Sequence, residues 1–310
     1  MQEGSILRPV SHLFGPVGEG IKLELYLGNA EYGEVFHAAL AMLCHSDVTV
    51  RLEPGSRQAM FESFLATVAA TAAEVLEHDS QRIGKSEKEL PKGKMVPRSK
   101  KITNSRRLIT EKYRSSGAVQ ALQALQRKFT CTCGDYLRVQ LAKSDVNKKK
   151  ILVWIRRADA HDTHRNTTPE LLVELTEIVE ALGCQPVYIG ASLDKPYVKP
   201  LDLIEFYLND SFSEPHSIMK QLGMFVELKK TYRVVGSVGM MSGGMDGPTL
   251  FAGLPAVTLM HNAKVTKIAH YDGKVAGYHV VKVSSNKSLG NVTDTVRAKL
   301  RSISDTVVLD

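Results

Sequence analysis

The first half of the chain alternates short apolar runs with longer segments of helical pattern. Residues 21–27 alternate apolar and polar positions and end at Gly28, residues 30–43 are apolar at helical spacing, and residues 48–52 alternate again. This pattern predicts a strand, a glycine-containing turn, a helix and a second strand. Three further elements are predicted in this half: a helix at 56–78, a helix at 118–128 and a strand at 136–141.

The second half alternates strands and helices more regularly. Thr168 followed by Pro169 is typical of a helix start, and Gly183 is typical of a helix end. Because the connections are short, we predict a parallel sheet with helices on both faces. The predicted strands are 151–155, 186–189, 233–236 and 256–260, and the predicted helices are 169–182, 214–229, 246–252 and 289–303.

The polar, lysine-rich stretch 145–150 separates the two halves. The chain has 310 residues, which gives room for two domains of about 150 residues each. We therefore predict an α/β protein with domains at 1–147 and 148–310. A hydrophobic content of 43% and a charged content of 24% are ordinary globular values, so a wholly disordered or collagen-like chain is excluded.

The positive charge is concentrated in one segment. The formal net charge is +7, yet between Lys85 and Arg114 eleven basic residues stand against three acidic ones, so the rest of the chain is close to neutral. Residues 84–115 also lack a hydrophobic pattern, which predicts a mobile basic loop. Three interpretations of the loop are open. It is a lid over an anionic substrate, a surface that binds phospholipid or nucleic acid, or a solvated segment. We favour a mobile loop near a cleft, with an anionic partner.

The chain shows no secretory signal and no stretch of about 18 apolar residues, so we expect a soluble, cytoplasmic protein. Its four cysteines contain one close pair, Cys131 and Cys133, and neither a second pair nor a nearby histidine completes a zinc set. We interpret them as structural thiols. The close pair can oxidise, but its sequence context supplies no group that lowers a thiol pKa.

The glycine-rich region 234–259, VVGSVGMMSGGMDGPTLFAGLPAVTL, has the strongest chemical signal. Small residues let a backbone approach a ligand, and a helix N-terminus offers unpaired amides, so the region predicts an anion site suited to a phosphate. The alternative is a tight strand-to-helix turn in which Asp246 caps the helix. The spacing matches neither a P-loop nor a strict GxGxxG. The residues assigned to this ligand-binding region are Ser237, Gly239, Ser242, Gly243, Gly244, Asp246 and Gly247.

A hydrophobic strand, this Ser/Gly loop and a short helix ending in Ala252–Pro255 resemble the nucleotide-sugar-binding half of GT-B fold glycosyltransferases. The resemblance covers roughly residues 150–260 and implies two Rossmann-like domains facing a cleft. Heptosyltransferases carry a comparable segment, but they usually have a histidine where this chain has Asp246.

The first strand of the second half ends in 153–159, VWIRRAD, which is similar to the His-x-Arg-x-x-Asp motif of α1,6- and protein O-fucosyltransferases. The resemblance implies that Arg156 holds the β-phosphate of the donor, although Trp154 replaces the histidine. An arginine at this position can clamp a pyrophosphate, and Arg157 is a second candidate. In the alternative interpretation, one of the two arginines points to solvent or pairs with a nearby aspartate.

Asp159, the last residue of this motif, is followed closely by His161, Asp162 and His164. Such a cluster can supply a general base or ligands for a divalent cation, and the alternative is a solvated polar loop. We select His161 as the base, with Asp159 as its orienting partner. The resemblance implies that no metal is needed. In the first half, Gly28 and Asn29 are candidates for a substrate-binding turn, unless they only end the strand and cap the helix.

The sequence therefore predicts a metal-independent glycosyltransferase without a cofactor, in which a nucleoside diphosphate sugar donates its sugar to a hydroxyl acceptor. A rival prediction is a non-catalytic protein that binds a nucleotide or nucleotide sugar. A third is a basic module that associates with nucleic acid or a membrane. Because symmetric dimers are the commonest assembly, we also expect a homodimer.

Overall fold

The computed structural model divides the chain into two compact units. Unit 1 consists of Met1–Phe129 and Glu214–Met219, and unit 2 of Thr130–Ser213 and Lys220–Asp310. Residues 130–147, which the sequence analysis assigns to the first domain, thus lie in unit 2. The structure describes residues 6–7, 23–27, 33–44, 48–52, 54–82, 100–101, 116–142, 144–157, 163–191, 203, 217–261, 271–275 and 277–306.

Unit 1 contains a small mixed sheet with the strand order β1-β3-β2-β4. The central strands β2 and β3 are parallel, β4 is parallel to β2, and β1 runs antiparallel to β3. The strands are β1 (Ile6–Leu7), β2 (Leu23–Leu27), β3 (Val48–Leu52) and β4 (Lys100–Lys101). The predicted strands at 21–27 and 48–52 are therefore confirmed, and apart from β4 the predicted basic loop lies outside the described residues.

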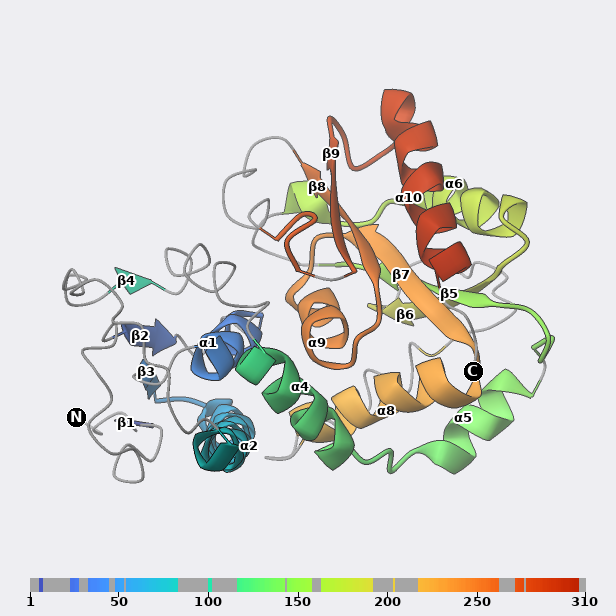
Figure 1. The fold of residues 1–310 in the computed structure, drawn as a ribbon. Helices are drawn as coiled ribbons and strands as arrows, with labels where there is room; N and C mark the ends of the chain where they lie inside the picture. Colours follow the sequence, from blue (N-terminus) through green and yellow to red (C-terminus); the bar gives the residue numbers. More distant parts are fainter. Residues whose placement is uncertain are drawn as a thin grey trace. The chain divides into compact units, whose positions relative to one another are not determined.

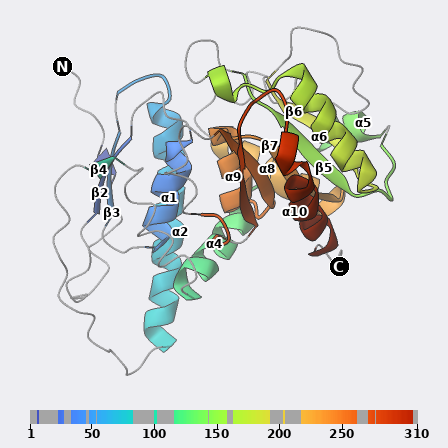
Figure 2. The same ribbon diagram turned by 90° about the horizontal axis from the view of Figure 1, so that it is seen from above.

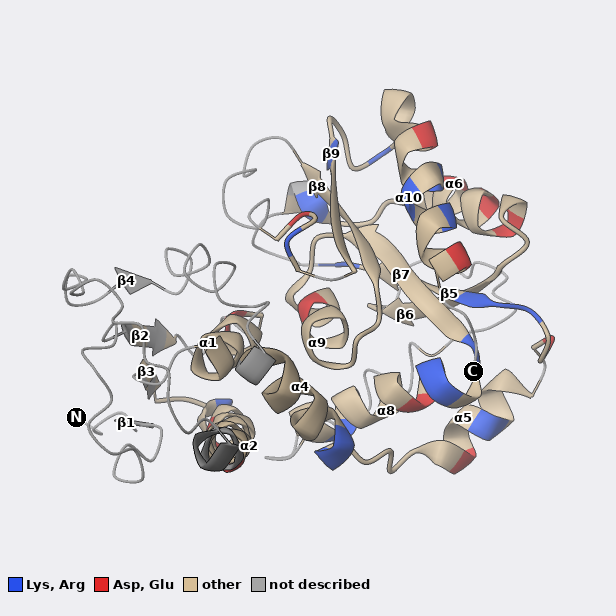
Figure 3. Ribbon diagram, viewed as in Figure 1, with Lys and Arg blue, Asp and Glu red and all other residues tan. Residues whose placement is uncertain are grey.

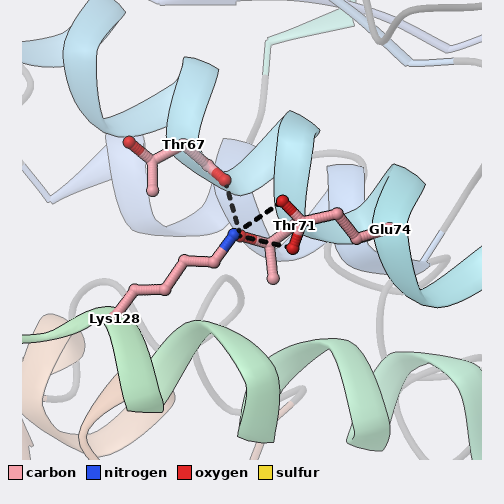
Figure 4. A network of polar contacts seen from close by, with 4 residues as sticks. All are labelled: Thr67, Thr71, Glu74 and Lys128. Carbon is pink, nitrogen blue, oxygen red and sulfur yellow. Dashed lines mark hydrogen bonds and ion pairs between the residues drawn. The ribbon is translucent and has the colours of Figure 1, made fainter.

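Helices α1 (Glu34–Cys44), α2 (Gln58–Arg82) and α4 (Ser116–Lys128) pack together on one side of this sheet (Figure 2). Every residue of α1 from Val35 to Cys44 is buried, and the rings of Phe36 and Phe64 meet edge to face with centroids 5.8 Å apart. An ion pair at the surface of this helix layer joins α4 to α2. In Figure 4 the Lys128 ammonium of α4 reaches both carboxylate oxygens of Glu74 in α2, at 2.8 and 2.9 Å.

Unit 2 is built on a five-stranded sheet in the order β6-β5-β7-β8-β9, in which every neighbouring pair is parallel. The strands are β5 (Lys150–Ile155), β6 (Gln185–Gly190), β7 (Val234–Met240), β8 (Ala256–His261) and β9 (Tyr278–Val283). All residues of β5 and β7 are buried. Burial on both faces is what a parallel sheet between two helix layers requires.

Helices cover both faces of this sheet (Figure 1). Side chains of α6 and α10 pack on one face with Val153, Val238 and Leu259, and side chains of α5, α8 and α9 pack on the other with Trp154. The helices are α5 (Gly134–Leu141), α6 (Pro169–Ala181), α8 (Ser217–Thr231), α9 (Gly243–Phe251) and α10 (Thr293–Thr306). The predicted α/β class, with a parallel sheet and helices on both faces, is confirmed for this unit.

The chain order of the strands creates a topological switch point. If the strands of unit 2 are numbered along the chain, the sheet order is 2-1-3-4-5. The chain moves to one side of β5 to form β6 and then to the other side to form β7. In open sheets of this kind, ligands bind where the chain reverses direction, beyond the carboxyl ends of the two central strands. Here those strands are β5 and β7.

Two predicted elements of unit 2 are wrong. The segment predicted as a strand at 136–141 belongs to helix α5, because Leu137 and Leu141 are buried one helical turn apart while Val139 between them is 63% exposed. The strand predicted at 233–236 continues to Met240, so Gly236, Ser237 and Gly239 belong to β7 and not to a loop. Strand β9 was not predicted at all.

Candidate functional site

The carboxyl ends of β5 and β7 bring two of the predicted phosphate-binding features together. Arg156 directly follows β5, and Ser242 follows the end of β7 by two residues. The two strands are hydrogen-bonded neighbours, with Trp154 opposite Gly239. Neighbouring strands lie about 4.8 Å apart, so the backbone leaves the sheet at adjacent points on either side of the switch point.

Arg156 is held by the loop that follows its own strand. Its Nη1 donates to Asn166 Oδ1 at 2.9 Å, and its backbone amide donates to Thr167 Oγ1 at 3.0 Å. The Thr167 amide in turn donates to the Arg156 carbonyl at 2.8 Å. The guanidinium is therefore oriented before any ligand arrives, which reduces the entropic cost of using it as a clamp. Arg157, the second candidate, is exposed.

The loop after β9 secures this arrangement. Asn286 Nδ2 donates to the Asn166 carbonyl at 2.9 Å, and Thr168 Oγ1 donates to the Asn286 carbonyl at 3.1 Å. Thr168 is also the N-cap of α6, because its Oγ1 accepts from the Leu171 amide at 3.3 Å. The sequence predicts Thr168 only as a helix start and indicates no role for Asn166 or Asn286. A short polar stretch such as 284–288 carries no signal that it meets a loop more than a hundred residues earlier.

The N-terminus of α9 lies at the end of β7 with its first turn only partly covered. Ser242 has extended backbone angles and is the N-cap, because its Oγ accepts from the Gly244 amide at 3.3 Å and its carbonyl accepts from the Met245 amide at 3.0 Å. Ser242, Gly243 and Gly244 are half-buried. Amides in the first turn of a helix and the positive end of its dipole favour an anion.

Asp246 has a different position from the one that the sequence suggested. It is not the cap of α9, and only 3% of it is exposed. Its Oδ1 accepts a hydrogen bond of 2.7 Å from the hydroxyl of Tyr278, at the start of β9. Burial, and then the negative charge of Asp246, raise the pKa of Tyr278 well above its ordinary value. Asp246 therefore fastens the first turn of α9 to the sheet, and Gly247 beside it is also buried.

The small residues of β7 are explained by packing. A Cβ on Gly239 would lie 2.5 Å from the Trp154 carbonyl oxygen, and a Cβ on Gly236 would lie 2.7 Å from Ile303 Cγ2. Ser237 is buried in the middle of the strand, about 10 Å below its carboxyl end at a rise of about 3.3 Å per residue. Its Oγ has no hydrogen-bond partner among the described residues. Ser237 and Gly239 are thus parts of the sheet interior.

Other predicted site residues lie outside the described part of the chain. These are Asp159, His161 and Asp162 after β5, and Gly28 and Asn29 after β2. His164 lies in the short 3-10 turn η3 (Thr163–Arg165). A residue that the sequence analysis did not consider, His261, ends β8 at the same edge of the sheet and is partly exposed. Among the described residues, no group of three or more His, Cys, Asp or Glu side chains is arranged to hold a metal ion.

Basic and acidic residues are interspersed over α5 and α10 of unit 2 (Figure 3). The described residues of these two helices therefore form no broad basic face. In the part of the chain that the structure describes, no helix combines the length and the apolar character needed to cross a membrane.

Comparison of the chain with models of protein families and with curated proteins gives no match.

Proposed function

We propose that the protein binds a nucleoside diphosphate sugar in unit 2 and transfers the sugar to a hydroxyl acceptor. The observation that carries the proposal is the pairing, at one topological switch point, of an oriented arginine with a glycine-rich helix N-terminus. Arg156 follows β5, and the capped start of α9 follows the neighbouring strand β7. Both groups favour an anion, and a diphosphate carries enough oxygens to contact both.

The proposed chemistry follows from the charge that develops in glycosyl transfer. As the bond between the sugar and the diphosphate breaks, negative charge grows on the leaving phosphate. A guanidinium and fixed backbone amides stabilise that charge without having to reorganise. The contacts are assigned to Arg156, Ser242, Gly243 and Gly244. The buried positions of Ser237, Gly239 and Asp246 make them supports of this site rather than ligands.

The remaining parts of the proposal rest on the sequence alone. These are the roles of His161 as the base and Asp159 as its partner, the substrate-binding turn at Gly28 and Asn29, and an arrangement of two Rossmann-like domains with the acceptor bound by the first. No metal or cofactor enters the proposed reaction. A homodimer and an anionic partner for the 84–115 segment also stay predictions.

The binding step is tested by thermal unfolding with guanosine and uridine diphosphates. A ligand at 100 times its dissociation constant adds about 2.7 kcal/mol to the free energy of unfolding, so a clear rise in the unfolding temperature is expected. Arg156→Ala should weaken binding about 10- to 100-fold, because hydrogen bonds to charged groups contribute about 1.5–3 kcal/mol. The control is Arg138→Ala, which removes an exposed arginine paired with Asp135 on α5 and should leave the affinity unchanged.

The outcomes separate the candidate functions. If no nucleoside diphosphate stabilises the wild-type protein, both the transferase and the non-catalytic nucleotide-binding protein are excluded. If diphosphates bind but no nucleotide sugar is turned over with any hydroxyl acceptor tested, the non-catalytic alternative holds. Equal affinity in Arg156→Ala and wild type would remove the arginine from the phosphate site.

A further inference from the structure

The Cys131–Cys133 pair differs from the other two cysteines of the chain. The two sulfur atoms lie 3.3 Å apart, and both side chains are partly exposed. Cys44 and Cys184, by contrast, are buried. Two thiols that share one short contact and can be reached by solvent form a pair able to react as a unit.

The backbone holds this pair in place. The backbone of Thr130 and Cys131 packs closely against Gly223 of α8. A Cβ added to Gly223 would lie 2.2 Å from the Thr130 carbonyl oxygen. Cys133 is the N-cap residue of α5, and its carbonyl accepts a hydrogen bond of 3.0 Å from the Leu137 amide. Both cysteines also pack against the hydrophobic core between α5, α8 and the sheet, beside Tyr136 and Tyr232. The two sulfurs are therefore neighbours because the fold fixes them on both sides.

We propose that Cys131 and Cys133 are a modification site that exchanges with low-molecular-weight disulfides of the glutathione class and closes to an intramolecular disulfide. The sulfurs need to approach by only about 1.3 Å to reach bonding distance.

The exchange proceeds in two balanced steps. The Cys131 thiolate attacks one sulfur of the small disulfide, which forms a mixed disulfide and releases one small thiolate. Cys133 then transfers its proton to that thiolate and attacks the Cys131 sulfur, which releases a second small thiolate, and this thiolate takes up the proton that Cys131 lost on ionisation. Two protein thiols are oxidised, and the small disulfide is reduced to two thiols. Burial, followed by the contact with Cys131, raises the pKa of Cys133, so Cys131 is assigned the first attack and Cys133 the second.

The test is incubation of the folded protein with oxidised glutathione, quenching by alkylation, and peptide mass spectrometry. In the wild type, we expect one peptide in which Cys131 and Cys133 have lost two hydrogen atoms and carry neither glutathione nor the alkylating group. Cys131→Ser and Cys133→Ser should instead stop at a glutathione adduct on the remaining cysteine, since no second thiol resolves it. Cys44 and Cys184 serve as internal controls that react only after denaturation.

A second measurement uses phenylarsine oxide, which bridges two neighbouring thiols without an oxidant. It should protect both cysteines of the wild type from alkylation. In each single variant, the one remaining cysteine of the pair should still be alkylated. The proposal is overturned if the wild type accumulates glutathione adducts to the same level as the single variants. It is also overturned if both wild-type cysteines are still alkylated after incubation with oxidised glutathione or after incubation with phenylarsine oxide.

Discussion

The two parts of the glycine-rich segment, residues 236–239 in β7 and residues 242–247 in α9, use small residues for different physical reasons. In β7 the glycines allow neighbouring groups to approach, because Trp154 and Ile303 occupy the space that a side chain would need. At the start of α9 the small residues leave the first amides only partly covered. Similar composition therefore serves close packing in one part and a candidate anion site in the other.

The largest effect is expected for Gly239→Ala. The added Cβ meets a backbone oxygen, which cannot rotate away, so β5 and β7 must separate locally. Overpacking of this kind costs about 3 kcal/mol of unfolding free energy. Urea denaturation measures the loss. The matched control is Gly134→Ala at the start of α5, where no atom lies within 4 Å of the new Cβ and the change should be close to neutral. Equal stabilities of the two variants would contradict the packing explanation.

Tyr278→Phe should have the next largest effect, because it removes the donor to the buried Asp246 carboxylate. The loss of one hydrogen bond to a charged group costs about 2 kcal/mol. The variant should also change how the free energy of unfolding depends on pH in the alkaline range. The pKa of Tyr278 is raised in the folded protein, so its contribution to stability is full below the unfolded value of about 10 and is lost as pH rises towards the folded value.

Urea denaturation at a series of pH values measures both effects. The difference between Tyr278→Phe and wild type should shrink above about pH 10, since the wild type alone loses this contribution. A difference that is constant across pH would show that the tyrosine hydroxyl does not titrate with folding. Tyr271→Phe, which alters the neighbouring ring, is the comparison variant for general effects on the packing of β9.

The smallest effects are expected for two serine variants, which should change the free energy of unfolding in opposite directions. Ser242→Ala removes the cap of α9 and should cost about 1 kcal/mol, and it should also weaken nucleotide binding. Ser237→Ala removes a buried hydroxyl without a partner among the described residues and should stabilise the protein by about 1 kcal/mol without a change in affinity. Thermal unfolding with and without diphosphate gives both values. If the two variants behave alike, the division of the segment into two parts is wrong.

The sequence predicted most elements of unit 2 because local pattern and tertiary structure agree there. Thr168 and Pro169 start α6 as expected, and the buried strands β5 and β8 consist mostly of apolar residues. The prediction failed where the deciding contact is distant in sequence. Glycines in β7 look like a loop until Trp154 is placed against them, and the apolar positions of 136–141 fit a strand until Val139 is seen to face solvent.

The candidate site was predicted in part for the same reason. Arg156 and Ser242 follow strands that the apolar pattern identifies, and parallel strands place their carboxyl ends at one edge. Asp246 was assigned to the site because it lies within the glycine-rich segment at the predicted helix start. Its partner Tyr278 lies 32 residues further along the chain, in a strand that the pattern did not reveal. No local rule could have assigned Asp246 to a buried hydrogen bond.

The pairing of β5 with β7 also bears on how the chain is made. Synthesis releases β5, α6 and β6 before α8 and β7, and until Val234 and the residues after it emerge, one edge of β5 has no strand to pair with. Its row of free amides and carbonyls, flanked by apolar side chains, is then open to strands of other chains. A nascent or truncated chain that ends before β7 should therefore aggregate readily and depend on chaperones, whereas one that extends through β7 closes that edge by itself.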